Sequence, residues 1–483
     1  MVKKRRRVSA GFPFQYSERS LEKALSLREK DNGMDRKVRF PQALRNFLSG
    51  SVFSLLSGVA LYITRIVFLR YMSVDYVGYT SLFENVFLFV SVLDSGLATS
   101  LTSFMARALR GEDEGRKNGV LREARRYYLL VSLLMSSLLF LVSLFYFGPK
   151  GLMVPALFYF LGQCSQYYLG WRVLALNASG RNDIVSKYVH MGRTLGALSE
   201  IIVISLTGNF TLYVFASMVS VIVSYILLFY KAGSVCTWID ENKGVVDEKE
   251  EKYLLGLMPS MFSHRFGSLF FRTYEVIAVN LLFGFSLGGR YSNLLLISNA
   301  FMTIFWIFQN SVTGIVGEHY AVEGRKNTFG LYRKMAVYNL FVSFAAALAF
   351  LLFGSYFGEL SFGKENIIGG ELPLLLSIEL FLLSSRTTLI VFRDAMGDYH
   401  RDRWKPILEA VMVIALNLIL SGTLSFLSIP VAVSITLILV SIPVDSYIVI
   451  HRLNDKSSSA FFRFYLSTLL ILAVLIAIGI LVL

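Results

Sequence analysis

Residues 47–69 read FLSGSVFSLLSGVALYITRIVFL, and residues 79–101 read YTSLFENVFLFVSVLDSGLATSL. The first stretch holds one charged residue, Arg65, and the second holds Glu84 and Asp94. A bilayer core is about 30 Å thick and an α-helix rises about 1.5 Å per residue, so about 20 apolar residues cross it. Both stretches are therefore predicted to be transmembrane helices.

Similar apolar blocks recur down the chain and predict thirteen transmembrane helices. The expected ranges are 47–69, 79–101, 127–147, 152–176, 189–208, 210–230, 259–283, 291–316, 334–354, 372–396, 406–426, 430–450 and 461–482. The chain has 483 residues, of which 55% are hydrophobic and 17% charged, and soluble domains of this size carry more charge. The polar residues 1–40 show no cleavable signal peptide.

The formal net charge is +14, which in a soluble protein would suggest a nucleic-acid partner. Membrane proteins, however, collect Lys and Arg in their cytoplasmic loops, so we expect no nucleic acid. The expected inner loops are rich in Lys and Arg and alternate with loops that are poor in both. The basic loops are 102–126, 177–188, 317–333 and 397–405. This alternation predicts a multi-pass protein of the cytoplasmic membrane with its N-terminus in the cytoplasm and its C-terminus outside. The basic arm 1–46 would fix that orientation or bind anionic lipid.

An internal repeat organises the helices. Helices one to six and seven to twelve follow the same order, and the fourth helix of each half ends in a similar segment, ASGR at 178–181 and AMGD at 395–398. Six is an even number, so both halves face the same way. The predicted fold is an all-α membrane protein with two six-helix lobes, related by a pseudo-two-fold axis along the membrane normal, plus one C-terminal helix. Such lobes with a site between them are typical of transporters. The predicted parts are an arm 1–46, a lobe 47–230, a cytoplasmic linker 231–258, a lobe 259–450 and an extra helix 461–482.

Several short stretches match one family in order and spacing. They are RY at 70–71 with DYVGY at 75–79, LDSGL at 93–97, YSN at 291–293, and KPILE at 405–409 leading to NLILS at 417–421. Over about residues 45–450 the chain resembles bacterial polysaccharide flippases of the Wzx type, in the multidrug/oligosaccharidyl-lipid/polysaccharide exporter superfamily. The resemblance implies a twelve-helix core that exports an undecaprenyl-pyrophosphate-linked oligosaccharide by alternating access, often coupled to an ion gradient.

Charged residues inside a membrane cost about 2.5–3.5 kcal/mol on insertion scales, so they usually face a cavity or a partner. The predicted helices contain Arg65, Glu84, Asp94, Glu200, Arg265, Arg272, Glu275, Glu379, Arg386, Glu409 and Asp445. They are the first candidates for a functional site.

We predict that Arg65, Arg265 and Arg272 line a cationic cavity that receives the pyrophosphate, because a guanidinium donates two parallel hydrogen bonds to phosphate oxygens. Asn293 is polar enough to line the same cavity. The alternatives are that Arg272 pairs with Glu275, its i,i+3 neighbour, and that Arg265 extends to the membrane interface.

The carboxylates Glu84, Asp94 and Glu275 are predicted to take up H⁺ or Na⁺ as the cavity changes sides. They could instead be partners of the arginines, and we favour that structural role for Asp94. Glu409 lies near a helix N-terminus and is interpreted as structural. Apart from a coupling ion we expect no cofactor or metal, because the two cysteines and five histidines show no metal-binding spacing.

Two other functions remain open. A multidrug or organic-cation antiporter could share the fold, although it should present carboxylates where Arg65 and Arg272 stand. A membrane glycosyltransferase or polymerase needs catalytic residues on a sizeable loop, and no external loop is long enough. We therefore expect a transporter, not an enzyme. Its expected partners are the lipid-linked oligosaccharide, membrane lipids and glycan polymerase or assembly proteins.

Overall fold

The computed structural model describes residues 52–94, 101–102, 104–105, 108–109, 114–240, 266–267, 269–271, 273–396, 404–454 and 458–482. The regular elements of these residues are all helices, and ten of them are long and apolar enough to cross a membrane. The protein is thus a multi-pass, all-α membrane protein, as predicted. The predicted basic arm 1–46 and most of the linker 231–258 lie outside the described residues.

The described residues 52–240 form the N-terminal lobe. Its helices are Val52–Tyr71, α2 (Val74–Val90) with η1 (Ser91–Asp94), α4 (Glu114–Val142) with η2 (Ser143–Phe147), α5 (Met153–Gly170), α6 (Val173–Ala178), α7 (Asn182–Thr207) and α8 (Phe210–Val235). An aromatic core joins α2 and α5, with the Phe83 ring edge-on to Phe147 and Phe160 at centroid distances of 4.8 and 5.9 Å.

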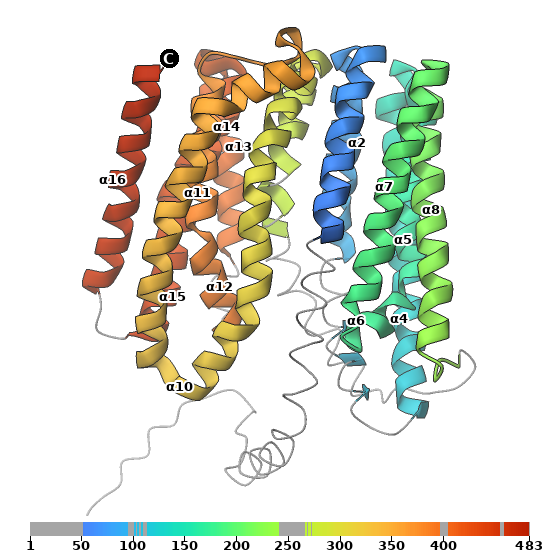
Figure 1. The fold of residues 1–483 in the computed structure, drawn as a ribbon, viewed down its shortest axis with the longest axis horizontal. Helices are drawn as coiled ribbons and strands as arrows, with labels where there is room; N and C mark the ends of the chain where they lie inside the picture. Colours follow the sequence, from blue (N-terminus) through green and yellow to red (C-terminus); the bar gives the residue numbers. More distant parts are fainter. Residues whose placement is uncertain are drawn as a thin grey trace, which may run out of the picture.

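The described residues 266–454 form the C-terminal lobe. Its helices are Thr273–Phe283, α10 (Phe285–Phe362), α11 (Leu372–Ser385), α12 (Thr387–Met396), α13 (Lys405–Leu424), α14 (Ser428–Thr436) with η6 (Leu437–Ser441), and α15 (Ile442–Leu453). The last helix, α16 (Ser458–Val482), packs against α10, α11 and α15. It stands at the outer edge of this lobe (Figure 1).

The two lobes stand side by side, with α2 and the first half of α10 between them (Figure 1). The helix α10 bends at Gly324, where φ is 72°, and runs back along the lobe. We call the end of the molecule with this bend the basic end, because the described parts of the predicted Lys- and Arg-rich loops, residues 114–126, 177–188 and 317–333, lie there (Figure 1). The opposite end, with the short turns at Met72–Ser73 and Gly208–Asn209, is the turn end.

The lobes meet closely at the turn end, where α2 and α10 begin. A Cβ added at Gly78 would lie 2.2 Å from the Phe285 carbonyl oxygen, and one at Gly289 would lie 2.1 Å from that of Val74. Only glycine allows backbones to approach so closely. The hydroxyls of Ser81 and Ser292, 2.6 Å apart, add a hydrogen bond between the lobes.

Several predicted helix ends are wrong, mostly at the basic end. The helices α4 and α7 begin at Glu114 and Asn182, where helices were predicted from 127 and 189, and the predicted loop 317–333 is mostly helical. Hydropathy marks the membrane core, whereas Lys, Arg and Glu are good helix formers and continue a helix into water. The predicted helix 152–176 is also interrupted, at Trp171–Arg172.

Candidate functional site

Arg65 and Asn293, both predicted to bind substrate, meet between the lobes near the turn end. Arg65 Nη1 donates to Asn293 Oδ1 at 3.3 Å, across 228 residues of sequence. Asn293 is fully buried, and its Nδ2 donates to the Asn366 carbonyl oxygen at 3.0 Å, in η4 (Lys364–Asn366). One turn away, the Tyr62 hydroxyl donates to Ser361 Oγ at 2.6 Å. The bonds of Arg65 and Tyr62 join the N-terminal lobe to the C-terminal lobe, whereas the bond from Asn293 to Asn366 lies within the C-terminal lobe.

Arg65 forms no ion pair with any residue that the structure describes. It interacts electrostatically with Glu84, Glu200 and Tyr213, but its hydrogen-bond partner is the neutral amide of Asn293. A guanidinium has five N–H donors, so this side chain keeps donors for an anion. The side chain is partly exposed.

Glu200 lies beside Arg65 in the structure. It is 7% exposed on α7, and its carboxyl group hydrogen-bonds to Ser217 and Tyr213 on α8. The sequence marked it as a charge within a predicted helix but gave it no role. Its contacts with two hydroxyls fix its position in the lobe interior.

The two acidic residues predicted on the second helix are far apart. Glu84 is exposed on α2 and interacts electrostatically with Arg65 and Tyr159. Asp94 lies in η1, ten residues nearer the basic end, which corresponds to about 15 Å of helix. There it interacts with Tyr128. Only Glu84 therefore belongs to the same cluster as Arg65.

Glu275 lies in the C-terminal lobe and joins a second carboxyl group. The Tyr291 hydroxyl donates to Glu275 Oε2 at 2.7 Å, and the carboxyl groups of Glu275 and Glu379 interact electrostatically. The three residues are 0–6% exposed. Oε1 of Glu275 and Oε2 of Glu379 have no hydrogen-bond partner among the described residues. Two neighbouring buried carboxyl groups repel each other when both are ionised, and a proton held between them would relieve that repulsion.

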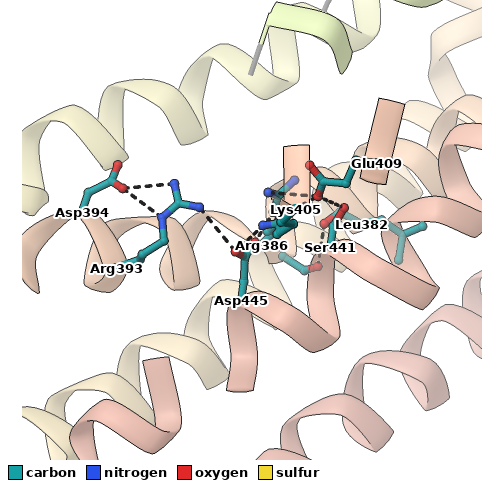
Figure 2. A network of polar contacts seen from close by, with 9 residues as sticks. Leu382, Arg386, Arg393, Asp394, Lys405, Glu409, Ser441 and Asp445 are labelled. Atoms are coloured by element: carbon teal, nitrogen blue, oxygen red, sulfur yellow. Dashed lines mark hydrogen bonds and ion pairs between the residues drawn. The ribbon is translucent and has the colours of Figure 1, made fainter. Parts of the chain in front are cut away.

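A second cluster of charges lies within the C-terminal lobe (Figure 2). Asp445, on α15 and fully buried, is its centre. Arg386 Nε donates to Asp445 Oδ2 at 2.5 Å, Arg393 Nη1 lies 3.4 Å from Asp445 Oδ1, and Lys405 Nζ pairs with the same oxygen. We call this cluster the C-lobe ion network; its members are Arg386, Arg393, Asp394, Lys405, Glu409, Ser441 and Asp445.

Glu409 completes the network from α13. Its Oε1 lies 3.7 Å from both Arg386 Nη2 and Lys405 Nζ, and accepts a 2.5 Å hydrogen bond from Ser441 Oγ. Asp394 pairs with Arg393 at 3.1 Å. Three cations thus face three carboxylates and join α12, α13 and α15 to the break between α11 and α12.

Two of the predicted substrate residues, Arg265 and Arg272, lie outside the described residues. Sequence analysis also missed a residue inside the N-terminal lobe. Arg193 was expected in the first turn of a helix beginning at 189, but α7 begins at Asn182 and places it three turns in. The sequence did offer one indication of Arg193, namely a basic residue within a stretch whose apolar residues recur with helical spacing.

No protein-family model and no curated protein matches the sequence. Solved structures do resemble this one. An inward-facing multidrug resistance MATE family transporter of the MOP superfamily is 13% identical, with a TM-score of 0.62 over 86% of this chain and 95% of that chain. The MATE transporter VcmN of Vibrio cholerae (D35N mutant) is 14% identical, with a TM-score of 0.59 over 89% of this chain and 97% of that chain.

The lipid II flippase MurJ, in an inward closed conformation, is also 14% identical, with a TM-score of 0.59 over 90% of this chain and 96% of that chain. At such identities the likeness shows the fold. The chain therefore has the fold of MOP-superfamily transporters, and the predicted two-lobe architecture is confirmed.

Proposed function

We propose that the protein is a flippase that exports a lipid-linked oligosaccharide, carried on undecaprenyl pyrophosphate, by alternating access. The observation that carries this proposal is the guanidinium of Arg65, which lies between the lobes without an ion pair among the described residues. A charge at membrane depth is costly, and one with no carboxylate in ion-pair contact suits an anionic ligand. The fold of MOP-superfamily transporters supports a transport role.

The partner of Arg65 suits an exchange of ligands. The bond from Arg65 to Asn293 already has a charged donor, but a phosphate adds the opposite charge and accepts two parallel hydrogen bonds from the guanidinium. A phosphate would therefore displace the amide of Asn293 from the guanidinium. Because the bond from Arg65 to Asn293 joins the two lobes near the turn end, binding of the headgroup would weaken the contacts that close this end. Substrate binding and opening would thus be linked.

We propose that Glu275 and Glu379 form the coupling site and hold one proton between them. The Tyr291 hydroxyl stabilises a negative charge on Glu275, because it donates to that carboxyl group. Release of this proton would leave two adjacent negative charges in a buried site, which is costly unless the lobe rearranges to admit water. That cost is a means by which a proton gradient could drive the opening. Glu84 and Asp94 remain predicted ion-coupling residues, and Glu84 is the nearer to Arg65.

The exposed carboxylate of Glu84 supports a second candidate, an antiporter of organic cations. An organic cation would need a negative site, and Glu84 shares its surroundings with Arg65. Arg65 reduces the negative potential there, so we favour the anionic cargo. We also propose that the basic end faces the cytoplasm, as the distribution of Lys and Arg predicts. Glycan assembly proteins would be the partners on the outer side.

Transport in vesicles tests the flippase proposal. Purified protein in liposomes would be supplied with a fluorescent polyprenyl-diphosphate oligosaccharide, and its arrival in the opposite leaflet would be measured by quenching. We expect Arg65→Ala to lower the rate at least tenfold and Arg65→Lys to restore part of it. The matched control is Arg463→Ala, on an exposed face of α16. Equal rates in wild type and Arg65→Ala would overturn the proposal.

A further inference from the structure

Arg193 lies on the face of α7 that points into the N-terminal lobe. The lipid-facing side of this helix is marked by exposed apolar residues every three or four positions, namely Met191, Leu195, Leu198, Ile202 and Leu206. Arg193 lies on the opposite side, which it shares with Gly196, Glu200 and Ile204. These three are buried whereas Arg193 is exposed. Its exposure is therefore to space within the lobe, not to lipid.

Two polar residues lie at the same depth as Arg193. Arg193 is fourteen residues from the end of α7 at Thr207, so it lies about 21 Å from the turn end. Tyr225 on α8 and Gln166 on α5 lie about 22 and 20 Å from the starts of their helices at the same end. The Tyr225 hydroxyl donates to Gln166 Oε1 at 3.3 Å, and Arg193 interacts electrostatically with Tyr225. We call these three residues the middle tier.

The middle tier is separate from the site at Arg65. Glu200, beside Arg65, is seven residues further along α7, which is about 10 Å nearer the turn end. Tyr159 lies six residues from the start of α5, about 9 Å from the turn end and thus level with Glu200, and it interacts electrostatically with both Glu200 and Arg193. The N-terminal lobe thus has polar residues at two depths along one inner face.

The chemistry of the middle tier suits a sugar phosphate. Arg193 forms no ion pair among the residues that the structure describes, and Tyr225 and Gln166 are neutral. A guanidinium binds phosphate oxygens in pairs, while a phenol and an amide can donate to and accept from sugar hydroxyls. An arginine at membrane depth without an acid in ion-pair contact would otherwise be a cost to the fold.

We infer that the middle tier is a second binding station for an anionic sugar-phosphate headgroup, occupied before Arg65 when the headgroup enters from the basic end. The inference rests on the proposed direction and cargo of transport, but the station itself needs only an anionic, hydroxyl-bearing ligand. Arg193 binds the phosphate, and Tyr225 and Gln166 contact the adjoining sugar. The two arginines then divide the crossing into two shorter steps.

Thiol labelling tests the location of Arg193 without transport. In a background with both cysteines changed to serine, Arg193→Cys should react with a membrane-impermeant maleimide, and Leu195→Cys, two residues away on the lipid-facing side, should not. Farnesyl diphosphate should slow the reaction at position 193. An unreactive Cys at 193, or equal reaction at 195, would overturn the inference.

Binding of two probes tests the function of the station. The probes are farnesyl diphosphate and its derivative with one sugar on the diphosphate, titrated against purified protein. We expect Arg193→Gln to weaken both at least tenfold, Arg193→Lys to weaken them less, and Gln166→Ala to weaken only the sugar-bearing probe. Arg463→Gln is the control, and melting temperatures establish that each variant is folded.

The binding experiment distinguishes failure of the middle tier as a binding station from failure of the proposed function. If Arg65→Gln weakens both probes and Arg193→Gln, folded by its melting temperature, weakens neither, the station is refuted and the flippase proposal stands. If Arg193→Gln weakens both and Arg65→Gln neither, the station stands and Arg65 loses its role. If Arg193→Gln does not fold, Arg193→Lys and the labelling experiment decide. Wild-type probe binding by Arg193→Lys, together with an unlabelled Arg193→Cys, would refute the station.

Discussion

The arginines of the two lobes have different surroundings. In the N-terminal lobe Arg65 and Arg193 have no ion pair among the described residues. The hydrogen-bond partner of Arg65 is the neutral Asn293, and Arg193 lies at the depth of the neutral pair Tyr225 and Gln166. In the C-terminal lobe Arg386 and Arg393, with Lys405, share three carboxylates in the C-lobe ion network (Figure 2). The same residue type therefore stabilises one lobe and remains available to a ligand in the other.

The comparison suggests that the two lobes have different functions. Charges that are paired inside a protein contribute to holding its elements together, and removing one partner leaves the other buried and uncompensated. Charges without an ion-pair partner are energy costs that a ligand of opposite charge relieves. On our account the N-terminal lobe binds the cargo, and the carboxyl pair of the C-terminal lobe couples its movement to protons.

Among the tests of this comparison, the largest loss of stability is expected on substitution of Asp445. Its replacement by Ala leaves three cations with two carboxylates in a buried site, so we expect a loss of about 3–5 kcal/mol in the free energy of unfolding. The matched control is Asp394→Ala, at the network's edge with a side chain 24% exposed, and we expect a much smaller loss. Thermal unfolding in detergent measures both. Equal losses would show that Asp445 contributes no more to the stability of the network than Asp394.

The next effect separates the two kinds of arginine. We expect Arg386→Gln to lower the melting temperature, since it leaves Asp445 and Glu409 with fewer partners. Arg65→Gln should keep the melting temperature and lower transport at least tenfold, because it weakens binding of the cargo and not the fold. Both quantities would be measured on the same preparations. A destabilised Arg65→Gln with normal transport would reverse the roles that we assign.

A third prediction concerns the carboxyl pair. Glu379→Gln replaces one carboxyl by an amide that can still donate to Glu275, so the pair no longer has to hold a proton. We expect the variant to fold normally and its transport to lose dependence on an imposed proton gradient. Vesicles with and without a pH difference give the measurement. A gradient response as large as in wild type would remove the pair from coupling, and Glu84 would be tested next.

The smallest effect is expected at the closed turn end. Ser81→Ala removes one hydrogen bond to Ser292, which contributes about 1 kcal/mol, or about a fivefold change in the ratio of closed to open molecules. Spin labels on the turn ends of the two lobes would report a wider distance distribution. Ser132→Ala, whose hydroxyl bonds only within its own helix, is the control. An unchanged distribution would show that the glycine contacts alone close this end.

Much of the fold was predictable, because apolar blocks and the charge of the loops follow directly from the bilayer. The site was less so. The sequence identified Arg65 and Asn293, yet their contact joins residues 228 positions apart and depends on how the lobes pack. The pairing of Glu275 with Glu379 likewise joins helices from separate parts of the lobe. Arg193 was missed because hydropathy placed the start of its helix seven residues too late.

Binding of two lipids of opposite charge tests the central claim most directly. Farnesyl diphosphate and farnesylamine share the same tail, and each would be titrated against the wild-type protein and Arg65→Gln. We predict that the wild type prefers the diphosphate and that Arg65→Gln binds it at least tenfold more weakly, with no loss for the amine. A wild-type protein that prefers the amine, or a diphosphate affinity unchanged in Arg65→Gln, would contradict the account.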